Sequence, residues 1–459
     1  MDATARLPLA DLLPLTAGLA PGGHLALGGC DAVELAERFG TPLYVYDART
    51  LRVQCRDYVE AFRSEYPQST VLYASKAYLS RPLARRIAAE GLGFDAVSGG
   101  EIEVLRASGV AMETVYLHGN SKERWELDLA VEAGVGRIVI DNEEEIPLLG
   151  EAASAGGRRQ GVLLRLSPGV DAHTHEKTTT GILDSKFGVP VATGAAERAL
   201  AAVLEQPSLD LRGLHMHLGS PIVELEPFEL GIAVMADFAA GVCRDRFGVE
   251  VREFSPGGGF AVGYAAGDPV PPPAAYARAI ASAVRREWGE RGLPLPHISV
   301  EPGRSIVARA GVALYQVGAR KEVPGIRTYV SVNGGMADNV RPAMYGSRYE
   351  ALSAERPTAA PEETVTIAGK YCESGDVLLR DARLPRLRRG ELLAVPAAGA
   401  YQLSMSSNYN LSYRPAVVLV EEGQARLLRR RERASDLMAL DVEPGPGDAA
   451  EAAGSSRDE

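Results

Sequence analysis

A lysine at the end of an apolar strand candidate is the first residue that could do chemistry. Lys76 closes the run TVLYASKA (70–77) and is one of only six lysines among 49 basic residues. At the carboxyl end of an early barrel strand, a lysine points at the barrel mouth, where such folds keep their active sites. Desolvation there lowers the pKa of the amine, as a Schiff-base lysine requires. The alternative is a structural lysine whose head reaches solvent.

Two further strand ends carry residues suited to an anionic ligand. FSPGGGF (254–260) follows a strand candidate, and its three glycines allow backbone N–H groups to close on a phosphate. A glycine turn without a ligand is the alternative. EPGRS (301–305) ends another strand, and its carboxylate and guanidinium could grip a protonated ring nitrogen and a substrate carboxylate. A structural ion pair is the competing interpretation.

Two histidine pairs raise the question of a metal. HMH (215–217) places two imidazoles on one face of a strand, and HTH (173–175) lies in a polar, threonine-rich segment typical of a loop. HxH on a barrel strand suits a metal-dependent hydrolase. The other strand ends offer no convincing Asp or His ligands, and one His of such a pair can instead cover an aromatic ring. We therefore expect no metal.

The elements that must position these residues alternate between strand and helix. Short β-branched or aromatic runs alternate with helical stretches whose apolar residues recur at i, i+3, i+4 and i+7. The strand candidates are 43–47, 70–77, 94–98, 114–119, 137–141, 162–167, 213–219, 251–259 and 297–303. This alternation predicts a parallel (β/α)8 barrel over 43–305. A doubly wound open sheet is the alternative, but no GxGxxG follows the first strand.

The remaining segments have a different pattern of predicted secondary structure. Closely spaced strands with few helices over 306–440 indicate a second, mostly antiparallel β-domain. We expect the N-terminal segment 1–42 to pack with that domain. The acidic, Gly/Pro/Ala-rich stretch 441–459 cannot bury enough surface to fold and is expected to be disordered.

Composition narrows the class of protein. A formal charge of −11 argues against nucleic-acid and anionic-membrane partners. No apolar run approaches the roughly 18 residues of a membrane helix, and the start MDATARLPLADLLPL lacks a signal-peptide pattern. The four cysteines are far apart and form no CxxC. We expect a cytoplasmic protein.

Taken together, the motifs resemble those of a known family. YASKA, HMHLGS, PGGGF, EPGRS, GGMADNVRPAMYG, CESGD and AGAYQLSMSSNYN occur in the order found in diaminopimelate decarboxylases. These enzymes use pyridoxal 5′-phosphate (PLP) and have the alanine-racemase-like fold. The resemblance runs from about Leu43 to Val420, and SPGVDAHTHEKTTTGILDSKFGV is similar to the family's loop between the middle strands.

The resemblance implies a set of cofactor-binding residues. Lys76 would bind PLP covalently, His217 would stack on its ring, and Glu301 would pair with the pyridine nitrogen. The phosphate would be held by Ser220, Gly257, Gly258, Gly259 and Tyr401, with Gly303 and Arg304 also at the cofactor. A protonated pyridine nitrogen makes the ring a strong electron sink, which decarboxylation requires.

It also implies the substrate site. Arg304, Arg341, Tyr345 and Tyr401 would meet substrate, the first three of them at its carboxylates, and Glu373 would bind the distal ammonium. Cys372 would protonate Cα after CO2 leaves. In the family, the Cys and Glu of CESGD enter the neighbouring subunit's site, so the resemblance implies a homodimer with shared active sites.

The implied reaction is PLP-dependent decarboxylation of meso-2,6-diaminopimelate to L-lysine and CO2, the last step of lysine biosynthesis. A relative acting on D-ornithine, D-lysine, carboxynorspermidine or a carrier-bound amino acid is the alternative. A monocarboxylate substrate would leave a buried arginine without a partner, which is costly. The sequence departs from the family's usual pattern at Asn333, where Asp is common, and at Pro221, where Gln is common.

Overall fold

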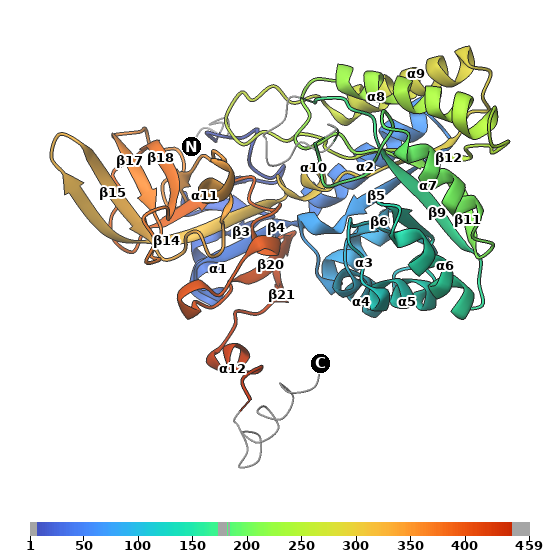
Figure 1. The fold of residues 1–459 in the computed structure, drawn as a ribbon. Helices are drawn as coiled ribbons and strands as arrows, with labels where there is room; N and C mark the ends of the chain where they lie inside the picture. The colour runs from blue at the N-terminus through green and yellow to red at the C-terminus, as the bar shows by residue number, and fades with distance from the viewer. Residues whose placement is uncertain (1–6, 173–180, 182–183, 443–459) are drawn as a thin grey trace.

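The chain folds into a barrel and a β-domain that lie side by side (Figure 1). The structure is a computed structural model, and it describes residues 7–172, 181 and 184–442. The HTH histidines, part of the loop around them (173–180 and 182–183) and nearly all of the acidic C-terminal stretch lie outside the described residues.

Eight parallel strands close the barrel. The first strand pairs with the last, and each strand otherwise pairs with its neighbours in the order of the chain. They are β5 (Ser69–Ala74), β6 (Gly93–Ala96), β7 (Val115–Leu117), β8 (Arg137–Ile140), β9 (Gln160–Ser167), β11 (Leu209–His215), β12 (Glu253–Gly257) and β13 (His297–Val300). The short β10 (Val189–Pro190) adds to β9. Several strands are buried along almost their whole length, because helices cover the outside of the barrel. The predicted barrel is confirmed.

Helices alternate with these strands and surround them (Figure 1). They are α2 (Ala48–Glu65), α3 (Arg81–Ala89), α4 (Gly99–Ala107), α5 (Arg124–Ala133), α6 (Glu145–Ala155), α7 (Ala195–Leu204), α8 (Glu226–Asp237) and α9 (Pro273–Glu290). Local signals fix their starts, as at α4, where the Ser98 side chain accepts from the Glu101 amide. The aromatic rings of Phe228, Phe260 and Tyr276 pack together beneath α8 and α9.

The β-domain is mostly antiparallel, as predicted. Its strands are β14 (Gly311–Val323), β15 (Arg327–Val332), β16 (Leu352–Ser353), β17 (Glu363–Ala368), β18 (Val377–Leu384), β19 (Leu392–Val395), β20 (Ala416–Glu421) and β21 (Gln424–Arg429). Short helices α10 (Arg304–Val307), α11 (Arg341–Tyr345) and α12 (Ala434–Leu437) complete this half of the chain.

One strand prediction is wrong. The run 43–47 was expected to open the barrel, but β4 (Leu43–Asp47) lies in the β-domain sheet, antiparallel to β14 and parallel to β20. All five of its residues are buried. A strand buried on both faces has the same apolar pattern in either sheet, so the pattern alone could not separate the two. The barrel begins at β5.

The N-terminal segment contacts the same sheet. It contains β1 (Gly18–Leu19), β2 (Leu25–Leu27), β3 (Cys30–Asp31) and α1 (Ala32–Phe39). Leu25, Leu27 and Leu35 share an apolar cluster with Val45 of β4 and Val418 of β20.

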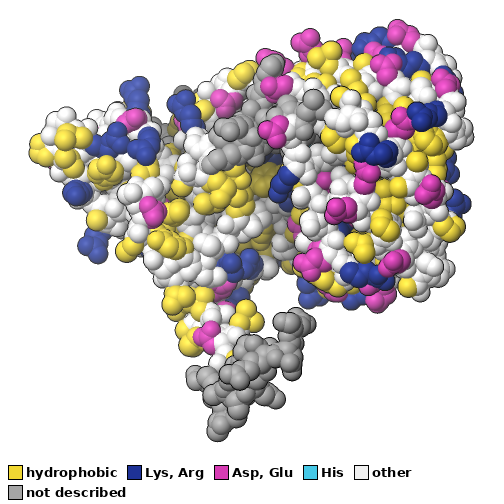
Figure 2. All heavy atoms as spheres, in the orientation of Figure 1, with side chains coloured by type: hydrophobic (Ala, Val, Ile, Leu, Met, Phe, Trp, Pro, Cys, Tyr) yellow, Lys and Arg dark blue, Asp and Glu magenta, His cyan; other side chains and the backbone are white. Residues whose placement is uncertain are grey.

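The surface mixes charges of both signs. On the face drawn in Figure 2, acidic and basic side chains are interspersed over the barrel. Within the described residues, no helix is both long and apolar enough to span a bilayer.

Candidate active site

The carboxyl ends of the barrel strands bring the predicted residues together. Lys76 lies in a 3-10 turn directly after β5, and His217 follows β11. Gly257–Gly259 end β12, and Glu301 follows β13, with Arg304 opening α10. Tyr401 reaches the same place from the β-domain, where its amide donates to the Ala77 carbonyl at 2.8 Å. Parallel strands place these groups at one barrel mouth.

Lys76 faces a buried carboxylate. Its Nζ lies 3.6 Å from Oδ2 of Asp95, at the end of β6, and its side chain is 41% exposed, so a ligand can reach the amine. Burial alone would lower the pKa of Lys76, but the charge of Asp95, with contributions from Tyr401 and Glu301, raises it above its ordinary value. The expected lowering is therefore wrong, because the sequence does not reveal that Asp95 is adjacent.

Glu301 is the centre of a buried polar cluster. His215 Nε2 lies 3.1 and 3.3 Å from its two oxygens, and Ser255 Oγ donates to Oε1 at 2.8 Å. Burial raises the pKa of Glu301, but His215 and His118 outweigh it and hold that pKa well below its usual range. Glu301 is thus an ionised acid deep in the barrel, suited to a protonated ring nitrogen.

His118 lies between two acids. Its Nε2 is 3.6 Å from Glu301 Oε1 and 3.7 Å from Asp95 Oδ1, and its ring packs edge-on against His215. Burial lowers the pKa of His118 to about 4 despite both carboxylates. His118 is therefore neutral near neutral pH.

His118, His215 and Glu301 could reach a common metal ion, since their ligand atoms lie within 4.8 Å of one another. The statement that no further strand end supplies a His or Asp is therefore wrong: β7 leads into His118 and β6 supplies Asp95. His215 Nε2 contacts both Glu301 oxygens directly, whereas His118 Nε2 has no hydrogen-bond partner among the described residues. We interpret this cluster as the Glu301 carboxylate held by histidines rather than as a metal site.

The glycine turn (257–259) packs closely against the backbone of two neighbouring strand ends. A Cβ on Gly258 would lie 2.3 Å from the Glu301 carbonyl oxygen, and one on Gly257 would lie 2.5 Å from the Met216 carbonyl. Gly257 and Gly259 have φ of +79° and +98°, which favours glycine. The Gly258 amide donates to His217 Nδ1 at 3.1 Å. Burial, with Lys76 and Arg165 nearby, holds the pKa of His217 well below its usual range, so its ring is neutral.

Two buried arginines lie beside this cluster. Arg304 donates to Ser220 Oγ at 3.2 Å and to Tyr264 OH at 2.9 Å, and its guanidinium lies 4.8 Å from the Tyr401 ring centroid. Arg341, at the start of α11, lies 4.8 Å over the Tyr264 ring. Tyr345 ends the same short helix and is half-buried. A Cβ on Gly303 would press on Ala74, so glycine lets α10 approach β5.

Cys372 and Glu373 lie elsewhere, in the exposed loop between β17 and β18. The Cys372 amide donates to Asn410 Oδ1 at 3.1 Å, and its carbonyl accepts from Tyr409 OH at 3.3 Å. The closest hydrogen-bond partners of Glu373 are in its own turn. The structure thus leaves these two on the surface of the β-domain, whereas Lys76, His217, Gly257–Gly259, Glu301, Arg304 and Tyr401 meet at the barrel mouth.

Asn333 and Pro221, the two positions that depart from the family's usual pattern, lie in different surroundings. Asn333 accepts from the Gln316 amide at 3.0 Å and donates to Thr41 at 2.7 Å, so it holds the β-domain together. Pro221 is exposed next to Ser220. Only Pro221 adjoins the site.

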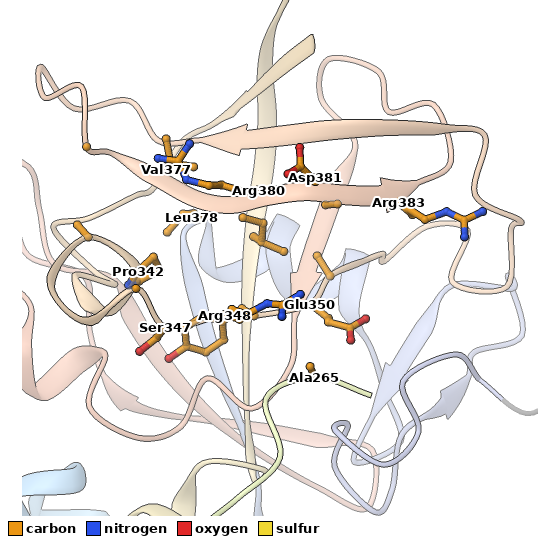
Figure 3. Close-up of a pocket in the computed structure, with 17 residues that line it drawn as sticks. Ala265, Pro342, Ser347, Arg348, Glu350, Val377, Leu378, Arg380, Asp381 and Arg383 are labelled. Atoms are coloured by element: carbon orange, nitrogen blue, oxygen red, sulfur yellow. The ribbon is translucent and has the colours of Figure 1, made fainter. Parts of the chain in front are cut away.

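A cavity of about 710 Å³ lies in the β-domain (Figure 3). It is lined by exposed arginines such as Arg348 and Arg380, together with Glu350 and Ala265. None of the buried charged groups at the barrel mouth lines this cavity. Tyr349, which contacts Arg341, is the residue shared between the cavity lining and the surroundings of those groups. Size therefore does not mark the site, and the buried charges do.

Several site residues were not predicted. Asp95, His118, Arg165, Tyr264 and Tyr349 received no role, and His215 was considered only as a metal ligand. Asp95 and His118 stand at strand ends, the signal that singled out Lys76. Tyr264 and Tyr349 lie in loops and carry no comparable signal.

Comparison with known proteins decides the family. The family model "Pyridoxal-dependent decarboxylase, pyridoxal binding domain" matches residues 52–308. The diaminopimelate decarboxylase of Bacillus subtilis is 45% identical over 420 residues, covering 92% of this chain and 95% of that protein. This chain belongs to the diaminopimelate decarboxylase family.

Solved structures agree with this membership. The diaminopimelate decarboxylase of M. jannaschii, in complex with L-lysine, is 34% identical with a TM-score of 0.86, covering 94% of this chain and 98% of that one. A lysine/ornithine decarboxylase from Vibrio vulnificus is 23% identical with a TM-score of 0.72, covering 88% and 100%, and shows the fold alone.

The cofactor of this decarboxylase family is PLP, and the barrel mouth fits it. An amine, a buried ionised acid and a glycine turn lie together there. The buried Arg304 Nε has no hydrogen-bond partner among the described residues. Unpaired buried polar atoms are costly, so their presence indicates a polar ligand.

Proposed function

We propose that this protein decarboxylates meso-2,6-diaminopimelate to L-lysine and CO2, as the last step of lysine biosynthesis. The observation that carries the proposal is the pair of buried guanidinium groups, Arg304 and Arg341, which both contact Tyr264. A substrate whose only carboxylate is the one that leaves as CO2 would leave both buried guanidinium groups without an anion. Membership in the diaminopimelate decarboxylase family supports the same substrate.

The cofactor would be held by residues from several strand ends. Lys76 would bind PLP covalently, His217 would cover its ring, and Glu301 would keep a proton on its pyridine nitrogen. Ser220, Gly257–Gly259 and Tyr401 would hold its phosphate, with Gly303 and Arg304 adjoining. Bound PLP supplies an electron sink for the pair left by the departing carboxylate.

The chain's own residues orient the Glu301 carboxylate, bind the substrate and supply a proton. His215 and Ser255 orient the Glu301 carboxylate, and the contact with His215 lowers its pKa. Arg304, Arg341 and Tyr345 bind substrate carboxylate, and Glu373 binds the distal ammonium. Cys372 donates the proton that replaces CO2 on Cα.

Cys372 and Glu373 act, in this proposal, in the site of a second subunit. Their exposure on the β-domain, away from the barrel mouth of their own subunit, supports donation across a homodimer interface. Each active site then combines one subunit's barrel with the partner's loop.

We also place the enzyme in the cytoplasm. All four cysteines, among the described residues, are free thiols. A thiol that donates a proton must stay reduced, and the cytoplasm keeps thiols reduced.

The test is CO2 release by purified, PLP-loaded protein given meso-diaminopimelate, with D-lysine, D-ornithine and carboxynorspermidine in parallel. We expect release from meso-diaminopimelate alone, with L-lysine formed in equal amount. Release from one of the other amino acids would reassign the substrate within the same fold. A yellow protein that releases nothing would contradict the proposal and favour a carrier-bound substrate.

A further inference from the structure

Tyr264 stands between the two arginines that the proposed function gives to substrate. Arg304 Cζ lies 5.9 Å and Arg341 Cζ 4.8 Å from its ring centroid. Its hydroxyl accepts from Arg304 Nη1 at 2.9 Å. Two more rings extend the series. The Tyr401 ring centroid lies 4.8 Å from Arg304 Cζ, and the Tyr349 ring centroid lies 5.7 Å from Arg341 Cζ. Rings and guanidinium groups thus alternate.

The arrangement offsets a repulsion. Two cations held near one another in a buried site repel, and each aromatic face between or beside them attracts a guanidinium. Tyr349 closes the far side: its hydroxyl accepts from Arg341 Nη1 at 2.5 Å, and its ring meets Tyr264 edge-on at 5.2 Å. Arg304 keeps a buried Nε without a hydrogen-bond partner among the described residues.

The backbone of Tyr264 is held as firmly as its side chain. The amides of Tyr264 and Ala265 both donate to Asp268 Oδ2 at 2.9 Å. The Ala266 amide donates to Glu350 of the β-domain at 2.7 Å, and Ala265 and Glu350 lie near one another in Figure 3. This loop follows β12 of the barrel, whereas Arg341 and Tyr349 come from the β-domain. Tyr264 therefore ties the two halves of the chain at the arginine pair.

We infer that Tyr264 is a specificity-determining positioning residue, which holds Arg304 and Arg341 together as one receptor for the carboxylate that the product retains. This rests on the proposed function for the identity of that carboxylate. Tyr264 acts through the arginines: its hydroxyl fixes the edge of Arg304 and its ring fixes the plane of Arg341. Loosening either should weaken recognition of a carboxylate without touching the cofactor.

The test uses two variants of Tyr264 in the PLP-loaded enzyme. Tyr264→Phe removes the hydroxyl and keeps the ring, whereas Tyr264→Leu removes both. Tyr66→Phe is the matched control, because Tyr66 is a buried tyrosine that donates to the Pro296 carbonyl at 2.7 Å, away from the arginines. Calorimetry measures binding of L-lysine, which carries a carboxylate, and of cadaverine, which carries none.

We expect Tyr264→Phe to weaken L-lysine binding about tenfold, as loss of one hydrogen bond to a charged group does. Tyr264→Leu should weaken it further, while cadaverine binding and the visible absorbance of the cofactor stay as in wild type. In turnover, KM for meso-diaminopimelate should rise while kcat changes much less. A general structural defect would weaken both ligands together.

Equal L-lysine affinity in Tyr264→Leu and Tyr66→Phe would overturn the inference, as would parallel losses for L-lysine and cadaverine. The binding measurement needs no turnover. Wild-type enzyme that binds L-lysine through Tyr264 but releases no CO2 from meso-diaminopimelate would therefore refute the proposed function and leave the inference standing.

Discussion

Lys76, Asp95, His118 and Glu301 form a continuous series of close polar groups. The successive separations are 3.6 Å from Lys76 to Asp95, 3.7 Å from Asp95 to His118 and 3.6 Å from His118 to Glu301. Burial decides the state of the histidine, and neighbouring charge decides the state of the lysine. The result is two carboxylates separated by a neutral imidazole, with one cation at the open end.

Replacing Lys76 tests the covalent link. We expect Lys76→Ala to lose the visible absorbance of the holoenzyme after gel filtration, because no other amine would hold the cofactor. CO2 release should fall about a thousandfold or more. Lys321→Ala, at an exposed position on β14, should keep both signals. Retained absorbance in Lys76→Ala would show that the lysine is misassigned.

His118 gives a pH dependence of stability. Its pKa falls from the ordinary value of 6.5 to about 4 on folding, so the unfolded chain binds more protons between these values. The stabilisation is complete above the unfolded pKa and is lost as pH falls from 6.5 toward 4. For a shift of this size the loss between pH 7 and pH 5 is about 2 kcal/mol.

The non-titrating variant His118→Gln isolates this effect. Urea unfolding at pH 7 and pH 5, with PLP at fixed excess, should show a smaller loss of free energy on acidification in the variant than in wild type. The expected difference is about 2 kcal/mol. Identical losses in both proteins would mean that His118 is not held neutral in the fold.

At the scale of elements, the turn that ends β12 lies against two other strand ends. Gly257 lies against Met216 after β11, and Gly258 against Glu301 after β13. These contacts are between backbone atoms, which cannot move aside as a side chain can. The turn therefore sets the spacing between Glu301 and His217, the two groups proposed to hold the cofactor ring.

Adding one methyl group tests this spacing. Gly258→Ala would place Cβ 2.3 Å from the Glu301 carbonyl, so the turn must shift, and we expect the affinity for PLP to fall at least tenfold. Gly289→Ala, in α9, meets nothing within 4 Å and should leave PLP affinity unchanged while stabilising the helix by up to about 1 kcal/mol. Fluorescence titration of apoenzyme with PLP compares the two. Equal affinities would contradict the role of the turn.

At the scale of the whole molecule, the chain crosses between its halves more than once. β4 lies in the β-domain sheet and leads directly into α2 of the barrel, and Tyr401 returns from the β-domain to the Lys76 turn. Hydrophobic side chains gather over the hollow between the halves (Figure 2). Cys372 and Glu373, by contrast, are exposed on the β-domain, and the proposed function assigns them to the active site of a second subunit.

Mixing two inactive variants tests sharing between subunits. Lys76→Ala and Cys372→Ala should each be inactive or nearly so, and Cys372→Ala should keep its cofactor absorbance. After unfolding and refolding together, random pairing restores about a quarter of the sites, so roughly a quarter of wild-type activity should return. A mixture that stays inactive, although it forms mixed dimers, would place Cys372 in its own subunit's site.

The sequence by itself determined the barrel, the β-domain and the family. Periodicity marked the barrel strands, because burial imposes a repeat that local sequence records. The motifs around Lys76, Gly257–Gly259 and Glu301 identified strand ends, and parallel topology requires such ends to meet.

The tertiary structure decided what depends on distance between segments. It placed β4 in the second sheet, because a strand buried on both faces has the same pattern wherever it pairs. It raised the pKa of Lys76 through Asp95 and set Tyr264 between Arg304 and Arg341. Electrostatic and cation–π energies depend on separations of a few ångströms between residues far apart in sequence, and only the folded chain fixes those separations.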